Sequence, residues 1–191
     1  MSHAPIRHNP SAGLRFATRG IRIHVEESLG IGKLRIVGDD RSAAFQQCFG
    51  VQPPAVRTGI ARDDIAIAWL APDEWLLIGS EARIAAEVDR LSMLMADRAL
   101  AVDIGHGRVS LILEGPSARE AISSVSALDI RPGSFAVGSV ARTALASTGM
   151  FIARLLDAPD GGRFRIVVDQ TMARHAVRML AGPDYLQDQD R

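Results

Sequence analysis

The chain runs through one pattern of secondary-structure elements twice, and this repeat limits the folds that it can adopt. An Ala-Pro-Asp turn occurs in each half, as APDE at 71–74 and as APDGG at 158–162. Apolar runs typical of strands flank both turns: DIAIAWL and WLLIG in the first half, MFIARLLD and RFRIVV in the second. Because strands joined by so short a turn pair with each other, we predict an antiparallel hairpin in each half.

A strand and a short helix precede each hairpin, and a longer helix follows it. The first half opens with KLRIVG and SAAFQQCF, and the second with RVSLILEG and SAREAISSV. Ser80 and Asp169 are candidate N-caps of the helices that end the two halves, and Ser117 and Glu120 have the spacing of a capping box. Helices beside hairpins predict an α+β fold, made of duplicated strand-helix-strand-hairpin-helix modules with mainly antiparallel sheets.

Composition divides the chain into three parts. These are an N-terminal arm at 1–30, a double module at 31–182 with halves at about 31–98 and 99–182, and a polar tail at 183–191. The arm is rich in Pro, Gly, Arg and Ser, although IRIHV within it alternates like a short strand. LAVDI is predicted as a strand that joins the halves.

Charge and cysteine content argue against several classes of protein. Acidic and basic residues balance at 22 each, so the chain lacks the concentrated basic field that binding to nucleic acid or a membrane surface requires. No run approaches ~18 apolar residues, and the first residues contain no apolar signal core. Cys48 is the single cysteine, so no internal disulfide can form, and we predict that it is a buried apolar residue. We expect a cytoplasmic protein.

Trp69 and Trp75 flank the first turn and are the chain's two tryptophans. Their large rings fit three roles: hydrophobic packing of the hairpin, a platform for a ligand, or burial against another subunit. The equivalent places in the second half hold Leu155 or Leu156, and Phe164. Because large apolar residues recur there while the turn sequence changes, hairpin packing or an interface is favoured over a ligand platform.

DIGHGR at 103–108 is the strongest candidate for a ligand site. Asp103, His106 and Arg108 could bind a ligand, and the two glycines would let it approach the backbone. One His and one Asp fall short of a zinc set, and Ser110 lacks the G-x-S-x-G elbow of a serine hydrolase. A plain turn, in which Asp103 and His106 bond to the backbone, explains the same letters. We therefore predict no catalytic residue and no metal site.

Three segments, LAPDEWLLIG, VDIGHGRVSLILEGPSAREAI and ALDIRPGSFAVGSVARTALA, resemble the gamma subunit of heterotetrameric sarcosine oxidase. The resemblance spans most of residues 30–181. The family pattern reads D-x-S-H-G-R, and this chain has Gly105 where that pattern has serine, so the loop lacks a hydroxyl there. The family is related to the folate-binding aminomethyltransferases, in which two α+β modules pack around a central channel.

The resemblance implies a function within a complex. It implies a non-catalytic gamma subunit that stabilises the large alpha subunit, beside beta and delta subunits, in an enzyme that oxidatively demethylates sarcosine to glycine. FAD, FMN, NAD and tetrahydrofolate are expected on the partner subunits, and none on this chain. Exposed apolar surface and the arm, which would order on docking, are expected to make the contact. The isolated chain is expected to self-associate.

Two alternatives come from other classes of protein. A free-standing folate-binding, one-carbon-transfer protein of the same fold would need a polar cavity with an acidic residue that holds the pterin ring, and Asp103 is the first candidate for that residue. A general interaction module unrelated to sarcosine is the third possibility.

Overall fold

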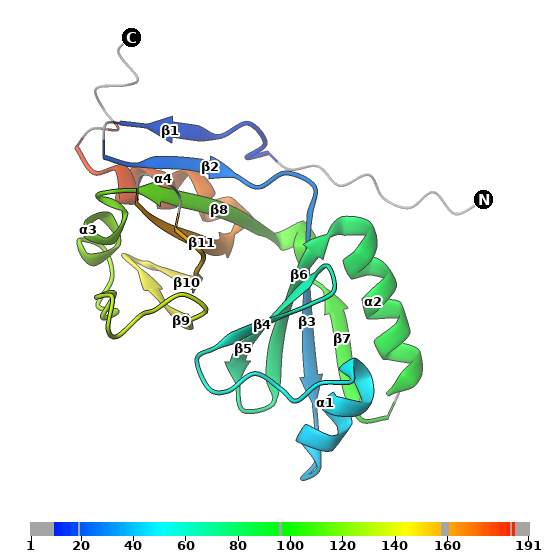
Figure 1. Ribbon diagram of the computed structural model, residues 1–191. Coiled ribbons are helices and arrows are strands. Elements are labelled where there is room, and N and C mark those ends of the chain that lie inside the picture. The colour runs from blue at the N-terminus through cyan, green and yellow to red at the C-terminus, as the bar shows by residue number, and fades with distance from the viewer. Residues whose placement is uncertain (1–9, 19, 96, 158–160, 184, 186–191) are drawn as a thin grey trace.

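Two antiparallel sheets, each packed against helices, make up the protein (Figure 1). The computed structural model describes residues 10–18, 20–95, 97–157, 161–183 and 185. The five-stranded sheet has the order β4-β5-β6-β3-β7, and the six-stranded sheet has the order β1-β2-β8-β11-β10-β9. Neighbouring strands in both sheets are antiparallel.

The five-stranded sheet and its helices form the first module. Its elements are β3 (Leu29–Ile36), α1 (Arg41–Phe49), β4 (Gly59–Arg62), β5 (Ile65–Ala71), β6 (Glu74–Ser80), α2 (Glu81–Leu94) and β7 (Ala99–Asp103). Both helices cover the same face of the sheet. Their buried side chains, such as Phe45 and Leu91, pack there against Leu34, Ile67 and Leu77 of the strands.

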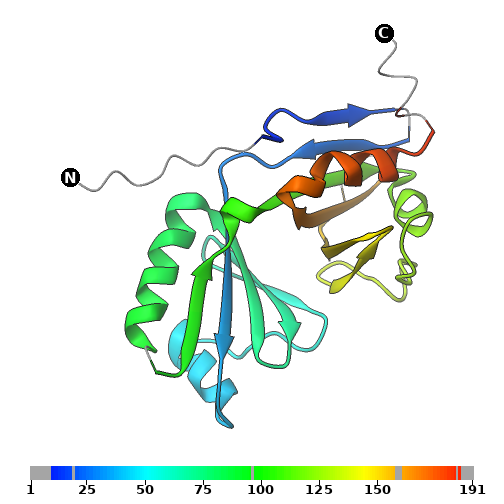
Figure 2. The same ribbon diagram turned by 180° about the vertical axis from the view of Figure 1, so that it is seen from behind.

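The six-stranded sheet and its helices form the second module, whose elements from β8 onward follow the 3₁₀ turn η1 (Gly105–Gly107). Its elements are β1 (Arg15–Ala17), β2 (Arg22–Val25), β8 (Arg108–Gly115), α3 (Ala118–Ser123), β9 (Val140–Leu145), β10 (Thr148–Arg154), β11 (Gly162–Asp169), the 3₁₀ turn η2 (Gln170–Met172) and α4 (Ala173–Ala181). The view from behind shows α4 against this sheet and α2 alongside β3 and β7 (Figure 2).

The predicted α+β duplication is confirmed. The set β3-α1-β4-β5-β6-α2 is followed by β8-α3-β9-β10-β11-α4, and both sets arrange their strands in the same sheet order. β7 lies beside the first strand of its repeat, and β2 occupies the corresponding position in the six-stranded sheet. Beyond β2 the six-stranded sheet adds β1, whereas β7 is the last strand of its sheet.

The start of the chain differs from the predicted arm. β2 matches the predicted strand IRIHV, but β1 pairs with it, and Phe16, Ile21 and Ile23 are buried in the core of the second module. These strands therefore belong to the six-stranded sheet and do not form a segment that orders on docking. The boundary between the halves also moves to η1, because β7 pairs with β3. Residues 1–9 and 186–191 of the predicted arm and tail lie outside the described residues.

The predicted helix caps are confirmed in one case of three. The Ser80 hydroxyl accepts a hydrogen bond of 3.3 Å from the Arg83 N–H at the start of α2. The capping-box and Asp169 predictions are wrong, since neither Ser117 nor Asp169 makes a side-chain cap bond. Asp169 pairs instead with Arg108, at 2.6 Å. The sequence analysis also missed β4 and β9, because these edge strands are partly exposed and lack a sustained apolar alternation.

Candidate functional site

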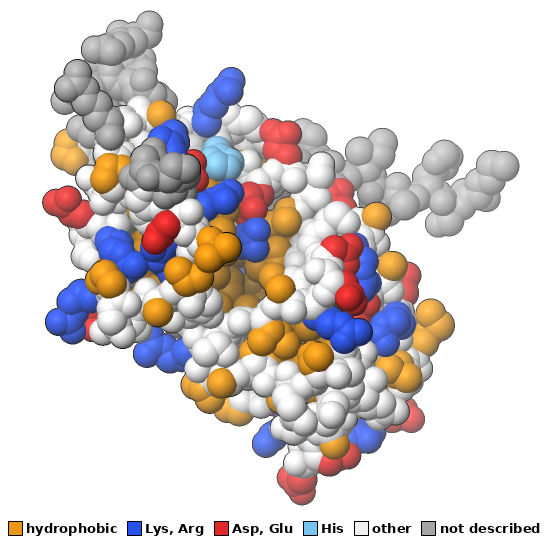
Figure 3. Space-filling model, in the orientation of Figure 1, with side chains coloured by type: hydrophobic (Ala, Val, Ile, Leu, Met, Phe, Trp, Pro, Cys, Tyr) orange, Lys and Arg blue, Asp and Glu red, His pale blue; other side chains and the backbone are white. Residues whose placement is uncertain are grey.

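The sheet faces that carry no helices pack against each other. The buried residues of this contact are Ile31, Ala68, Leu76, Ile78, Val140, Phe151, Ala153 and Val167. Two backbone hydrogen bonds also join the sheets: Gly59 N–H to the Gly138 carbonyl at 3.0 Å, and Val140 N–H to the Arg57 carbonyl at 2.8 Å. Figure 3 shows hydrophobic side chains in the hollow between the modules, with charged side chains around it. Apolar side chains thus fill the space along this contact.

A partly buried ion pair lies on the same face of the six-stranded sheet. Glu26, directly after β2, accepts hydrogen bonds of 2.6 and 2.7 Å from Arg165 of β11 and one of 2.6 Å from the Ser110 hydroxyl of β8. Burial would raise the pKa of Glu26, but these bonds outweigh it and hold the pKa below its ordinary value of 4.5. A carboxylate held ionised in this way is a poor general acid, so we assign the cluster to joining three strands.

A pocket of about 200 Å³ opens beside the contact between the sheets. Two ion pairs line it, Lys33–Glu74 at 2.9 Å and Arg108–Asp169 at 2.6 Å. Arg142 also lines it and forms no ion pair with the residues that the structure describes. The volume is below the ~300–1,000 Å³ of common small-molecule sites, so the pocket suits a small anion or an acidic side chain better than a cofactor.

The three residues proposed from DIGHGR have separate surroundings. Asp103 is exposed at the end of β7, where its Oδ1 accepts a hydrogen bond of 2.8 Å from the Gly105 N–H. His106 is exposed in η1, and its ring makes no hydrogen bond or ion pair within the described ranges. Arg108 begins β8 and lines the pocket between the sheets. Asp103 thus stabilises the turn, and Arg108 is the one of these three residues that lines the pocket between the sheets.

Trp69 and Trp75 lie directly opposite each other in the hairpin of β5 and β6. Trp75 is 3% exposed and packs against Phe45 of α1, with 4.9 Å between the ring centroids. Trp69 is partly buried against the apolar contact between the sheets. The two rings therefore belong to different apolar clusters: Trp75 to the core of the first module, and Trp69 to the contact between the sheets.

The second hairpin corrects one equivalence made from the sequence. In that hairpin Arg154 lies opposite Phe164, as Trp69 lies opposite Trp75 in the first. The residue equivalent to Trp69 is therefore Arg154, and the assignment to Leu155 or Leu156 is wrong. The Arg154 guanidinium lies over the Phe164 ring, 4.7 Å from its centroid, so a cation–π contact closes this hairpin.

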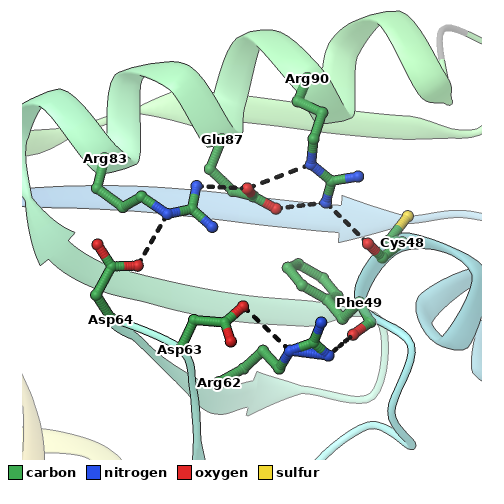
Figure 4. A network of polar contacts seen from close by, with 8 residues as sticks. All are labelled: Cys48, Phe49, Arg62, Asp63, Asp64, Arg83, Glu87 and Arg90. Carbon is green, nitrogen blue, oxygen red and sulfur yellow. Dashed lines mark hydrogen bonds and ion pairs between the residues drawn. The ribbon is translucent and has the colours of Figure 1, made fainter.

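A second polar network, absent from the sequence analysis, joins α1 to α2 (Figure 4). Glu87 is 2% exposed and accepts hydrogen bonds from Arg83 at 2.7 Å and from Arg90 at 2.5 Å. Arg90 also donates to the Cys48 carbonyl at 2.8 Å. Burial would raise the pKa of Glu87, but the two arginines outweigh it and lower the pKa below 4.5. Arg83 and Arg90 stand at i−4 and i+3 from Glu87, a helical spacing that could have indicated the network.

Cys48 lies beside this network in a second pocket, of about 210 Å³. The predicted burial of Cys48 is confirmed, and burial raises the pKa of its thiol, which makes it a poor nucleophile at neutral pH. Arg62, which also lines this pocket, pairs with Asp63 at 3.3 Å and donates to the Phe49 carbonyl at 2.5 Å. The charged side chains of this pocket thus bond to other groups of the chain.

Two searches of the described part of the chain bear on function. Among those residues, no group of three or more His, Cys, Asp or Glu side chains could hold a metal ion. None of the helices found there is both long and apolar enough to cross a membrane.

A model of the sarcosine oxidase gamma subunit family matches residues 37–176, which include most of both modules. The chain belongs to this family. Two curated sarcosine oxidase gamma subunits from Corynebacterium are similar to it. That of strain U-96 is 27% identical over 187 residues, covering 92% of this chain and 88% of the relative. That of strain P-1 is 28% identical over 128 residues, covering 65% and 62%.

Solved structures agree with membership of the sarcosine oxidase gamma subunit family. A chain of heterotetrameric sarcosine oxidase from Corynebacterium sp. U-96, in complex with pyrrole 2-carboxylate, matches with a TM-score of 0.71 and 26% identity, covering 86% of this chain and 84% of that one. Glycine cleavage system aminomethyltransferase T from Bartonella henselae matches with a TM-score of 0.61 and 16% identity, covering 85% and 45%. The second match shows the fold alone, and it confirms the aminomethyltransferase-like architecture.

Proposed function

We propose that this protein is the gamma subunit of a heterotetrameric sarcosine oxidase, an enzyme that oxidatively demethylates sarcosine to glycine. The observation that carries the proposal is the match, over 86% of the chain, to a subunit of an enzyme of that name. The family match supports it independently, because it covers both repeats of the duplicated fold. The complex would work in the cytoplasm.

In this proposal the chain is a non-catalytic subunit that stabilises the large alpha subunit, beside beta and delta. FAD, FMN, NAD and tetrahydrofolate would lie on those partners. The state of two carboxylates supports such a role, since arginines hold both the partly buried Glu26 and the buried Glu87 ionised. Asp103 bonds to the Gly105 N–H, and Arg108 is paired with Asp169. These groups are engaged in holding the fold.

A free-standing folate-binding protein has less support. Its acidic ligand to the pterin was expected to be Asp103, but Asp103 does not line either of the two pockets described above. The pocket between the sheets, at about 200 Å³, is also smaller than common sites for ligands of this size.

Co-expression of the four subunits, with and without this chain, tests the proposed function. We expect the chain to co-purify with the alpha subunit, and we expect the yield of soluble, active enzyme to fall when it is omitted. Asp103→Ala and His106→Ala should leave kcat of the complex within about twofold, because neither residue would touch a substrate. An alpha subunit that folds fully without this chain and does not bind it would contradict the proposal.

Calorimetric titration of the isolated chain with 5-formyltetrahydrofolate tests the alternative. Saturable binding at micromolar concentration, lost in Asp103→Ala, would favour a one-carbon-transfer protein. The chain's mass in solution, measured in the same preparation, tests the expected self-association.

A further inference from the structure

β7 (Ala99–Asp103) forms an open edge at a position that is covered in the other module. In the six-stranded sheet β2 holds the equivalent position, and β1 pairs with it as one more antiparallel strand. β7 ends its sheet, so the place that corresponds to β1 is empty within the described chain. The internal repeat therefore shows where a sixth strand fits on the five-stranded sheet.

The backbone of β7 has hydrogen-bonding groups available for such a strand. Ile104 N–H donates to the Ile31 carbonyl at 2.8 Å, and the Arg98 carbonyl accepts from Val37 N–H at 2.9 Å. In an antiparallel pair these bonds alternate, so residues 98, 100, 102 and 104 face β3, and residues 99, 101 and 103 face outward. The Ala99 N–H already donates to the Met95 carbonyl. The amides at 101 and 103 are left to point away from β3.

The side chains of β7 are unusual for a free edge. Leu100 is 62% exposed and Val102 is 40% exposed, and both lie on the face that carries no helix, opposite Arg35 and Lys33 of β3. Edge strands of soluble proteins are usually protected by charged residues or proline. The edge strand β9 follows that rule, because it exposes Arg142. An edge whose central residues are exposed and apolar is instead typical of a strand that pairs with another chain.

The charges around β7 indicate what kind of strand it accepts. Asp97 precedes β7, Asp103 ends it, and Asp89 lies on the neighbouring helix α2. All three carboxylates are exposed, and none forms an ion pair within the part of the chain that the structure describes. Elsewhere on the surface, Asp73 is paired with Arg35 at 2.9 Å and Glu114 with Arg163 at 3.4 Å. A partner segment with basic residues would complement these three.

Pairing with β7 of a second copy fits these charges poorly. The antiparallel register that sets Leu100 against Val102 of the other copy puts Asp103 opposite Ala99 and diagonal to Asp97. Diagonal neighbours on a sheet lie only ~7–8 Å apart, and like charges at close cross-strand positions are destabilising. The self-pair would bring one Asp97 and one Asp103 together at each end of the paired strands.

We infer that β7 is the edge on which a partner subunit of the complex adds an antiparallel strand, and that this strand alternates apolar and basic residues. Main-chain bonds to the outward amides at 101 and 103 would supply affinity. Contacts with Leu100 and Val102 and with the three aspartates would supply specificity. This inference rests on the proposed function, since the strand comes from another subunit of the oxidase.

Hydrogen exchange with mass spectrometry on the assembled complex and on the free chain tests the inference. The amides of Ala101 and Asp103 should exchange about tenfold more slowly, or slower still, in the complex, because a new strand would accept from them. Unchanged exchange across β7 in a complex that has formed would overturn the inference and leave the proposed function intact. If the unaltered chain does not join the complex, both fall together.

Substitution of the edge gives a second readout. Leu100→Lys with Val102→Lys places two cations on an exposed face opposite Arg35 and Lys33, so the thermal midpoint of the free chain should fall by no more than about 5 °C. Affinity for the partner subunits should drop about tenfold or more. Leu156→Lys is the matched control, because Leu156 is 77% exposed and lies outside β7. Asp89→Asn with Asp97→Asn should weaken binding several-fold and reduce its dependence on salt. Full affinity in the double lysine variant would overturn the inference.

Discussion

Trp69 and Arg154 occupy the same position in the two repeats. Trp69 N–H donates to the Thr58 carbonyl at 3.1 Å, and Arg154 N–H donates to the Ser139 carbonyl at 2.8 Å. Thr58 and Ser139 in turn bridge the two sheets by pairing with each other. The duplication is therefore approximately two-fold symmetric around this bridge, although an indole ring stands on one side and a guanidinium on the other.

Removal of the Glu87 carboxylate should destabilise the first module. Glu87→Ala removes the buried carboxylate that binds Arg83 and Arg90, and the charge-assisted hydrogen bonds are lost. Because both guanidiniums are partly exposed and Arg83 keeps its pair with Asp64, we expect a loss of about 1.5 kcal/mol in the free energy of unfolding. Asp89→Ala is the control on the same helix: its side chain is exposed and unpaired among the described residues, so the change should stay within about 0.5 kcal/mol. Urea unfolding followed by circular dichroism measures both, and equal costs would contradict the role of Glu87.

Acid should weaken the protein through Glu26. The pKa of Glu26 is below 4.5 in the folded state, so the unfolded chain takes up the proton first as pH falls. The stability that Glu26 contributes is complete above its unfolded pKa and is lost as pH drops through the folded pKa. Glu87 acts with the same sign. Urea midpoints should therefore decline from about pH 5 downward.

Arg165→Met should weaken this pH dependence at Glu26. Without the arginine, burial is opposed only by the Ser110 hydroxyl and by Arg163, so the pKa of Glu26 in the folded state rises relative to the parent. The variant should be less stable than the parent near neutral pH, and the difference should shrink toward about pH 4. Urea midpoints of the two proteins across that range give the comparison. A constant difference would show that Arg165 does not control this carboxylate.

Trp75 should tolerate phenylalanine much better than alanine. Its Nε1 is buried and has no hydrogen-bond partner among the described residues, so Trp75→Phe removes an unsatisfied donor and keeps the contact with Phe45. We expect a change within about 1 kcal/mol for Trp75→Phe and a loss of about 4 kcal/mol for Trp75→Ala. Chemical unfolding followed by circular dichroism measures both variants against the parent. Similar losses for both substitutions would exclude ring packing as the main contribution.

Gly115 should resist substitution, because it closes the turn at the end of β8. Its φ is +129°, and an added Cβ would lie 2.4 Å from the Gly20 carbonyl oxygen. Gly115→Ala should therefore lower stability by about 2 kcal/mol or more. Gly149→Ala is the control, since a Cβ there has no atom within 4 Å and should change stability by less than about 1 kcal/mol. Thermal unfolding of both variants makes the comparison.

Local patterns are sufficient to predict the duplicated elements. The spacing of Ile84, Val88 and Leu91 predicts the buried stripe of α2, and the short turns predict both hairpins, because these signals depend on near neighbours in the chain. No pattern among neighbouring residues indicates that β1 and β2 belong to the second module. Arg22 and Glu114, paired across β2 and β8, are 92 residues apart in sequence.

For the polar groups of the candidate site too, contacts between near neighbours in sequence can be predicted and contacts between distant residues cannot. Asp103 and Gly105 are two residues apart, and a turn between them is readable from DIGHGR. Glu26 and Arg165 are separated by 139 residues, so nothing near either residue indicates the other. The ligand-site hypothesis for Asp103, His106 and Arg108 rests only on their closeness in sequence. Their surroundings differ because Asp103 ends β7, His106 lies in η1 and Arg108 begins β8.

The placement of β2 beside β8 also has a consequence for synthesis of the protein. Ile23 and Val25 leave the ribosome early, but their partners Leu113 and Leu111 are made only after the whole first module. Because domains generally fold as units while the chain is being made, the first module can be complete while these earlier apolar strands still await their sheet. β2 is then among the last strands to reach its native place, and until that moment its apolar side chains are open to chaperones.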